Sequence, residues 1–238
     1  MLSFLDQTLE TPEGNLALDE ALLLEAEAGR SGEVLRVWEL PSYAVVLGSA
    51  GIIREDVNVE ACQQDGVPIL RRCSGGGAVV LGPGCVLFSL VLAYERAAAL
   101  GDISHSYGYI LSRIAAALTG RVSVTCAGTS DLAVENRKVS GNAQRRMRTH
   151  LLHHGSVLYD LDLSKLQRYL HLPRRQPAYR AERGHEEFVV NLGLSVQEIV
   201  APMRKAWDAN VVLRHWPRAS VEELVKARYG DHHWTWRR

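Results

Sequence analysis

The sequence lacks an excess of charge of either sign. Lysine plus arginine number 27, and aspartate plus glutamate also number 27, in a chain of 238 residues. Proteins that bind nucleic acid or anionic membranes through their overall electric field carry a basic surplus, which this chain does not have. We therefore expect no nucleic-acid partner, and any polyanion that binds is expected to be small and held by a local site.

Paired cysteines and a long apolar run are also missing. None of the four cysteines belongs to a CxxC pair, and the first residues lack a basic stretch followed by a long apolar one. The longest apolar stretch, residues 78–94, is interrupted by Gly82-Pro83-Gly84, which a membrane-spanning helix of roughly 20 residues rarely tolerates near its centre. These absences predict a cytoplasmic protein with reduced thiols and no membrane partner.

The hydrophobic patterns predict a single domain of mixed helices and strands. With 47% apolar residues, the chain can bury one substantial core. One-sided apolar spacing predicts helices in residues 16–29, with Asn15 as the N-cap, and in 55–64, 104–120, 163–170, 196–208 and 221–229. Runs of β-branched residues predict strands in 34–38 and 43–47 as a hairpin, in 67–70, in the two halves of 78–94 as a pair, in 131–134 and 138–140 as a hairpin, and in 155–160. Residues 173–183 are predicted to form a loop.

A glycine triplet, Gly75-Gly76-Gly77, follows two arginines. Glycines allow backbone N–H groups to approach a ligand closely, so the triplet predicts a cradle for phosphate or carboxylate. No Gly-Lys-Ser/Thr follows it, and a strand rather than a helix comes next, so it fits neither the P-loop nor the dinucleotide-binding fingerprint. A tight turn without a ligand is the alternative. Because strand residues alternate, Arg71 and Arg72 should point to opposite faces, so that only one of them faces the site.

Other polar residues allow both a functional and a structural interpretation. Lys138 at a strand start is either a site lysine or an exposed hairpin lysine. The adjacent His153 and His154 should point to opposite faces and have no third ligand at metal spacing, so we reject a zinc site there. The basic cluster formed by Arg145, Arg146 and Arg148 is either a solvated loop or a dock for an acidic carrier protein.

Taken together, four motifs resemble the catalytic domain of the lipoate-protein ligase family, within the biotin and lipoyl ligase superfamily. The motifs keep the family's order from about residue 2 to residue 195, and they are Asn15-Leu16-Ala17-Leu18-Asp19-Glu20, Arg71-Arg72-Cys73-Ser74-Gly75-Gly76-Gly77-Ala78-Val79, Asp131-Leu132 with Lys138-Val139-Ser140-Gly141-Asn142-Ala143, and His153-His154-Gly155-Ser156. The resemblance implies an α/β (α+β) fold with a mixed, largely antiparallel sheet flanked by helices. It also implies a catalytic domain in residues 1–195 and a short helical C-terminal extension in residues 196–238.

The activity implied by the resemblance is ATP-dependent ligation. Lipoate or octanoate would attack the α-phosphate of ATP, and the resulting acyl-adenylate would acylate a lysine of a lipoyl domain or an H-protein-like carrier. By the resemblance, Lys138 contacts the acyl carbonyl and the phosphate, Asp131 helps to hold Mg²⁺, and an apolar tunnel receives the acyl tail. The nucleotide-contacting positions implied are Arg72, Gly75, Gly76, Gly77, Ala78, Val79, Val80, Asp131 and Lys138. Full-length ligases often carry a further C-terminal domain, which implies either a reduced tail here or a separate accessory subunit.

Several alternatives stay open at this stage. The chain has Leu81-Gly82 and Gly84-Cys85 where many ligases have His-Asp and Gly-Asn, so the loop over the ligand is expected to differ in detail. An octanoyl or lipoyl transferase of the same fold would need no ATP and would use a cysteine thioester; Cys126, its pKa lowered by Lys138, is the candidate nucleophile. A buried structural cysteine is the competing interpretation of Cys126. A non-catalytic protein that binds lipoate or a carrier is a further alternative, as is biotin ligation on grounds of fold alone.

Overall fold

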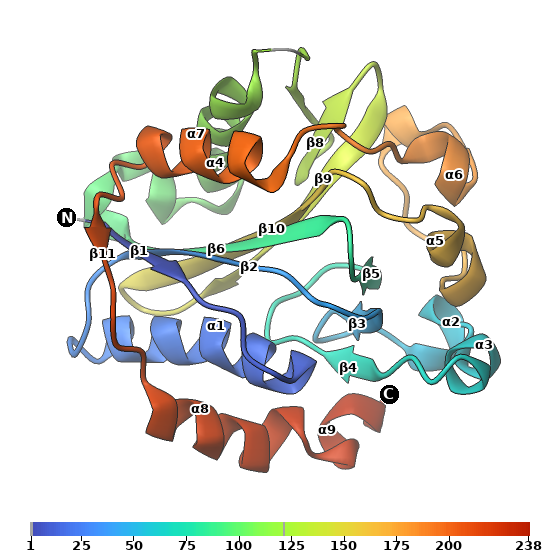
Figure 1. Cartoon of the computed structure of the whole chain (residues 1–238), viewed down its shortest axis with the longest axis horizontal. Helices are drawn as coiled ribbons and strands as arrows, with labels where there is room; N and C mark the ends of the chain where they lie inside the picture. Colours follow the sequence, from blue (N-terminus) through green and yellow to red (C-terminus); the bar gives the residue numbers. More distant parts are fainter. Residues whose placement is uncertain (1, 121) are drawn as a thin grey trace.

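The computed structural model describes residues 2–120 and 122–238. Over these residues the strands form a large sheet in the order β11-β1-β2-β6-β10-β9-β8-β7 and a small sheet in the order β4-β3-β5 (Figure 1). The strands are β1 (Ser3–Asp6), β2 (Val34–Trp38), β3 (Ala44–Leu47), β4 (Ile69–Arg71), β5 (Val79–Leu81), β6 (Cys85–Ala93), β7 (Thr125–Ala127), β8 (Asp131–Val134), β9 (Arg137–Arg146), β10 (His150–Leu158) and β11 (Val211–Val212). Pairing in the large sheet is antiparallel from β2 to β7 and parallel at β1, which confirms the predicted mixed, largely antiparallel sheet.

Helices cover both faces of the large sheet. In Figure 1, α4 and α7 lie on one face, and α1 lies on the other with α8 and α9 beneath it. The helices are α1 (Pro12–Glu27), α2 (Ile53–Asp56), α3 (Val59–Gln64), α4 (Ile103–Leu118), α5 (Ser164–Tyr169), α6 (His185–Phe188), α7 (Val196–Ala206), α8 (Arg218–Leu224) and α9 (His232–Trp236), with a π-helical turn at Val225–Tyr229. None of the helices in the described ranges has the length and apolar character needed to cross a membrane.

The first helix begins earlier than predicted. Thr11 is its N-cap and accepts a hydrogen bond from the Gly14 amide at 3.1 Å, and Pro12 occupies the first helical position. The proposed N-cap, Asn15, is instead fully buried inside the helix. Its side chain exchanges hydrogen bonds with the Leu9 backbone and accepts one from Arg36 at 2.6 Å, so the residue joins the helix to β2.

Two predicted strand pairings are wrong. Strands β2 and β3 do not form a hairpin, because β2 pairs with β1 and β6 in the large sheet while β3 pairs with β4 and β5 in the small one. Strands β5 and β6 separate in the same way at the turn 82–84. All residues of β2 and β3 are buried, and a strand without an exposed face carries no alternation that indicates which neighbour it will take.

The other predicted elements are present, with shifted bounds. The helix predicted at 55–64 is divided into α2 and α3, because Val57 between them is extended. The hairpin of β8 and β9 turns through Glu135 and Asn136, both with positive φ (49° and 59°), as a two-residue hairpin turn requires.

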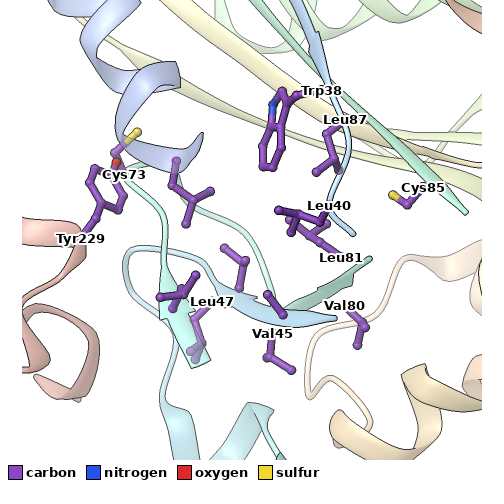
Figure 2. Close-up of a cluster of buried hydrophobic side chains, with 14 of the residues drawn as sticks. Trp38, Leu40, Val45, Leu47, Cys73, Val80, Leu81, Cys85, Leu87 and Tyr229 are labelled. Carbon is purple, nitrogen blue, oxygen red and sulfur yellow. The ribbon is translucent and has the colours of Figure 1, made fainter. Parts of the chain in front are cut away.

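Two apolar cores lie on either side of the large sheet. The α1 side includes the apolar residues between the large and small sheets, and Figure 2 shows Trp38, Leu87, Leu40 and Leu81 on one side of β3 and Val45 on its other side. The α4 side is built from β-strand and helix residues including Leu132, Ile110 and Trp207. Residues after 195 contribute to both cores and add β11 to the large sheet.

Candidate active site

A β-bulge places Lys138 on the face of the large sheet that is turned toward α1. Asp131 pairs with Gly141 and Ala133 pairs with Lys138, so one extra residue, Val139, is inserted in β9. In a regular strand Lys138 and Gly141 would point to opposite faces, because they are three residues apart. The insertion brings them to the same face, and a Cβ built on Gly141 would lie only 2.7 Å from Lys138 Nζ. We call the face that carries Asp131, Lys138 and Gly141 the site face.

Lys138 is held by the carboxylate of Asp131. The Lys138 Nζ to Asp131 Oδ1 distance is 2.8 Å, and the Tyr179 hydroxyl donates a hydrogen bond to Asp131 Oδ2 at 2.8 Å. Burial and the Asp131 charge raise the pKa of Tyr179 well above its ordinary value, so the phenol stays protonated and remains a donor. Lys138 is 28% exposed at its side chain, so the ammonium remains accessible beside a carboxylate that is 9% exposed.

The glycine triplet lies across from the same face. Gly76 has a φ of +93°, and a Cβ built on it would lie 4.0 Å from the Cβ of Ala143, the next residue on the site face after Gly141. Alternate strand residues are about 7 Å apart. The triplet and Lys138 therefore flank one short stretch of β9, and a Cβ built on Gly75 or Gly77 would have no neighbouring atom within 4 Å.

Arg72 and Arg71 point to different places, as strand alternation predicts. Arg72 is buried and donates to the carbonyls of Gly75 (2.6 Å) and Gly77 (2.9 Å), so its guanidinium braces the triplet. Burial lowers the pKa of Arg72 to about 10, and the side chain remains a cation at neutral pH. Arg71 points away from the triplet and donates to backbone carbonyls near the chain's last helix.

A buried chain of polar side chains links α1 to the base of the glycine loop. Ser74 Oγ lies 2.5 Å from His154 Nε2, and His154 Nδ1 lies 3.5 Å from Asp19 Oδ2. Asp19 in turn pairs with Arg36 at 2.5 Å. Burial raises the pKa of Asp19, but Arg36 and His154 outweigh it and hold the pKa below its usual value.

The sequence patterns did not predict that these polar side chains would be linked to one another. The residues Asp19, Ser74 and His154 fall in three of the recognised motifs, whereas Arg36 falls in none of them. A charged residue in the otherwise apolar strand 34–38 was the available signal, because a buried guanidinium needs a buried partner.

The two adjacent histidines point to opposite faces, as predicted. His153 is fully buried on the α4 side, between the side-chain amides of Gln144 and Asn142, each at 3.2 Å. An amide nitrogen only donates and an amide oxygen only accepts, so this arrangement satisfies one neutral tautomer. Burial lowers the pKa of His153 to about 3. Within the described residues, no group of three or more His, Cys, Asp or Glu side chains has metal-binding geometry.

The three arginines of the basic cluster lie in different surroundings. Arg146 is committed to the fold, because it donates to the carbonyls of Leu100 (2.6 Å) and Gly101 (3.0 Å). Arg148 is 86% exposed, with Glu27 3.8 Å away. Arg145 follows Ala143 by two residues and so shares the site face, where it is exposed. Of the three, Arg145 is therefore the one that is exposed on the site face.

The cysteines are not placed to act at Lys138. Cys126 pairs with Leu132, and paired residues share a face, so its side chain lies on the α4 side, opposite to Asp131. Partial burial raises the pKa of the Cys126 thiol, so the expected lowering by Lys138 does not occur. The remaining cysteines are buried, and burial raises the pKa of Cys73 and of Cys85 to about 12.

Two surface cavities lie away from these residues. One, of about 600 Å³, is lined by residues that include Tyr43, Asp65 and Arg168, and another, of about 500 Å³, lies near Asn58 and Glu186. Neither is lined by Lys138, Arg72 or the glycine triplet. The predicted acyl tunnel stays a prediction.

Solved structures define the class of fold. A bipartite lipoate protein ligase from Thermoplasma acidophilum, solved as part of a study that includes its E2 lipoyl domain, superposes with a TM-score of 0.81 at 21% identity over 99% of this chain and 96% of its own. A lipoate-protein ligase A bound with ATP gives a TM-score of 0.80 at 20% identity, and the match covers 99% of this chain and 97% of that one. The fold is thus that of the lipoate-protein ligases.

The family follows from the sequence itself. The family model described as the lipoyl protein ligase A/B catalytic domain matches residues 11–206, and this chain belongs to that family. A relative from Aeropyrum pernix, named as a lipoate-protein ligase A, is 31% identical over 93% of this chain and 77% of its own length. A Mycoplasma pneumoniae relative with the same name is 27% identical over 94% of this chain but only 67% of its own. An octanoyltransferase LipM of Geobacillus kaustophilus is 26% identical over 99% of this chain and 98% of its own length.

Proposed function

We propose that this protein is an ATP-dependent lipoate-protein ligase, which activates lipoate or octanoate as an acyl-adenylate and transfers the acyl group to a lysine of a lipoyl-domain or H-protein-like carrier. The observation that carries the proposal is the position of Lys138, which the bulge brings to the site face beside Asp131 and across from the glycine triplet. Among the described residues, Cys126 lies on the other face of the sheet from Lys138, and the other three cysteines are buried.

The chemistry requires cations and backbone donors more than a nucleophile. In the first step a carboxylate oxygen attacks the α-phosphorus of ATP and pyrophosphate leaves; in the second, the carrier's amine attacks the acyl carbonyl and AMP leaves. Both steps develop negative charge on phosphate and carbonyl oxygens, which fixed positive groups stabilise. Lys138, Arg145 and the backbone amides of the triplet, where a Cβ on Gly75 or Gly77 would meet no atom within 4 Å, would supply such groups on one side of the large sheet.

Arg72 acts through the triplet. Its hydrogen bonds to the Gly75 and Gly77 carbonyls turn those oxygens away from an incoming anion, and its charge lies directly behind the loop. A nucleotide phosphate held at the triplet would therefore meet backbone N–H groups backed by a buried cation.

A magnesium ion fits this set of residues only as a companion of the nucleotide. Mg²⁺ in nucleotide sites is held mostly by phosphate oxygens and water, with one or two protein carboxylates. Asp131 is the one carboxylate next to Lys138 in the part of the chain described, so it is the residue that would hold the ion, which would neutralise phosphate charge.

The acyl tail is expected between the two sheets. That region is apolar, and the Trp38 indole N–H is buried there without a hydrogen-bond partner among the described atoms (Figure 2). We expect a tail held there to leave its carboxyl group at the triplet and Lys138.

An acyl transferase is the second candidate function. The octanoyltransferase relatives are covered over nearly their full length, 98% for the Geobacillus kaustophilus protein, so this chain has the size of a transferase as well as of a ligase subunit. A cysteine-dependent transfer through Cys126 is less well supported, because that thiol lies on the wrong face and its pKa is raised.

Single-turnover acylation of an apo lipoyl domain separates the two candidates. The carrier's intact mass is followed with free lipoate in the presence and absence of ATP and magnesium, and separately with an acyl-carrier thioester and no ATP. Modification that needs ATP and is lost in Lys138→Ala supports the ligase. Transfer only from the thioester would overturn the ligase proposal, and its dependence on Cys126 would then be read from Cys126→Ser.

A further inference from the structure

The short helix α9 is joined to the glycine loop through Arg71. The guanidinium of Arg71 is fully buried, and each of its hydrogen-bond acceptors among the described residues is a backbone carbonyl. Two of these bonds reach the Thr235 carbonyl of α9, at 3.0 and 2.8 Å. A carbonyl in the last turn of a helix lacks an intrahelical partner and carries the negative end of the helix dipole, so a buried cation is a favourable partner for it.

The same guanidinium holds a turn that touches the triplet. Arg71 donates to the carbonyls of Gly48 (3.0 Å) and Gly51 (2.8 Å), which fixes the turn formed by residues 48–51. The Ser49 amide donates to the Ser74 carbonyl at 2.8 Å. A Cβ built on Gly48 would lie 2.0 Å from the Gly76 carbonyl oxygen, so the turn and the glycine loop are in direct backbone contact.

Further contacts keep α9 in this position. The Trp234 indole N–H donates to the Arg71 carbonyl at 2.9 Å. The guanidinium groups of Arg237 and Arg228 lie 3.8 and 4.7 Å from the centroid of the Trp234 ring. Arg228 and the Tyr229 hydroxyl both bond to the Glu20 carboxylate. Figure 2 shows Tyr229 beside Cys73, the residue directly before Ser74.

We propose that α9 is a positioning element of the glycine loop: through Trp234, Arg71 and the turn 48–51, it sets the backbone of residues 74–77 for binding an anion. Trp234, Arg71 and the turn 48–51 act through the loop and are not expected to touch the reacting atoms themselves. The identity of the anion, the nucleotide phosphate, rests on the proposed ligase function, whereas the positioning itself does not.

Hydrogen exchange of the intact protein tests the positioning directly. Trp234→Phe keeps an aromatic ring beside the two arginines and removes the indole N–H that donates to the Arg71 carbonyl. We expect backbone amides in 48–51 and 74–78 to exchange about five- to tenfold faster, as the loss of one hydrogen bond implies, while those of α4 are unchanged. Arg71→Lys keeps the charge but loses the several N–H donors of the guanidinium group, and it should have the larger effect on the same peptides.

Matched controls distinguish positioning from general loosening. Trp207→Phe removes a buried indole N–H that has no partner within the described residues, and Arg113→Lys removes a bond to the Ala206 carbonyl of 2.6 Å, both on the α4 side. These variants should leave exchange in 74–78 unchanged. Unaltered exchange there in Trp234→Phe and Arg71→Lys, or an equal increase in the controls, would overturn the proposal.

A kinetic measurement connects the loop to its ligand. In lipoate-dependent exchange of pyrophosphate into ATP, Trp234→Phe should raise the KM for ATP about five- to tenfold and leave kcat within about twofold. A fall in kcat with an unchanged KM would contradict positioning of a binding loop. If the parent protein shows no exchange at all, the ligase proposal fails, and the hydrogen-exchange result alone still decides whether α9 positions the loop.

Discussion

His153 and His154 are neighbours in β10, yet they lie in two different kinds of surroundings. His153 points toward α4, stacks with Phe88, meets the Tyr107 ring edge-on, and is held neutral between two amides. His154 points toward α1 and lies in a chain with Asp19 and Ser74 that ends at the glycine loop. The two histidines differ in their surroundings because they lie on opposite faces of the large sheet.

The face toward α4 is a stabilising core, and the site face carries charge. Charged groups are costly to bury, so a protein that retains Asp19, Arg36, Arg72 and Asp131 on one side must compensate each with a partner. The apolar core on the opposite face supplies the rigidity that keeps such a set in place. Substitutions on the site face should therefore change activity more than stability, and substitutions on the α4 face should change stability more than activity.

The largest effect is expected from Lys138→Ala. The variant removes the ammonium that lies beside Asp131, and we expect ATP-dependent acylation to fall about a hundred- to a thousandfold, as with the loss of a main charge-stabilising donor. Thermal unfolding should change little, because the side chain is partly exposed. Lys165→Ala, with a similar exposure of 29% and a pairing to Asp162, is the control and should retain activity. A Lys138→Ala protein with more than a tenth of the parent rate would break the assignment of the site face.

The next effect is expected from Gly48→Ala, across the gap from the site face. The added Cβ would lie 2.0 Å from the Gly76 carbonyl oxygen, so the glycine loop must shift. We expect the KM for ATP to rise about ten- to thirtyfold in pyrophosphate exchange. Gly32→Ala is the matched control, since its Cβ would meet no atom within 4 Å and should leave KM unaltered. Equal KM values in the two variants would show that the loop tolerates the displacement.

The sequence predicted the local elements of this site better than their partners. The glycine loop, the β8–β9 hairpin and the opposite orientations of Arg71 and Arg72 follow from glycine chemistry and from strand alternation. The pairing of β3 with the small sheet rather than with β2 does not, because a fully buried apolar run carries no face pattern.

The position of Lys138 depends on a feature that no local pattern reveals. Strict alternation would place Lys138 opposite to Gly141, and only the extra residue Val139 in β9 brings the two to one face. A bulge is set by packing of the whole sheet, here by the burial of Val139 against the α4-side core. Asn15 and Arg36 show the same limit, because their hydrogen bonds join segments 21 residues apart.

On the α4 face the comparison predicts an effect on stability that depends on pH. Above pH 6.5 the imidazole of His153 is neutral in both the folded and the unfolded chain, and below it only the unfolded chain takes up the proton, because burial lowers the folded pKa to about 3. His153 therefore destabilises the folded state as pH falls, by about 1.4 kcal/mol per unit. Between pH 6.5 and 5.0 the free energy of unfolding should drop about 2 kcal/mol more in the parent than in His153→Gln.

Urea unfolding at the two pH values measures this difference. His105→Gln is the control, since His105 is 80% exposed at its side chain, and its loss should leave the parent's pH dependence in place. An equal pH dependence in the parent and in His153→Gln would mean that the imidazole is charged in the folded protein, and that this face is not the neutral core described above.

The smallest effect is expected at Cys126, and it sharpens the comparison most. Cys126 lies close to Lys138 in sequence but shares the face of Leu132, at the edge of the sheet, and its thiol pKa is raised by partial burial. A thiol that is mostly protonated and turned away from the acyl carbonyl cannot form a productive thioester there. Cys126→Ser should therefore retain acylation of the carrier within about twofold, and alkylation should modify Cys126 ahead of the buried cysteines without loss of activity. Loss of acyl transfer in Cys126→Ser, with a normal unfolding curve, would mean that the nucleophile works from the α4 face, and the division between a stabilising face and a site face would have to be abandoned.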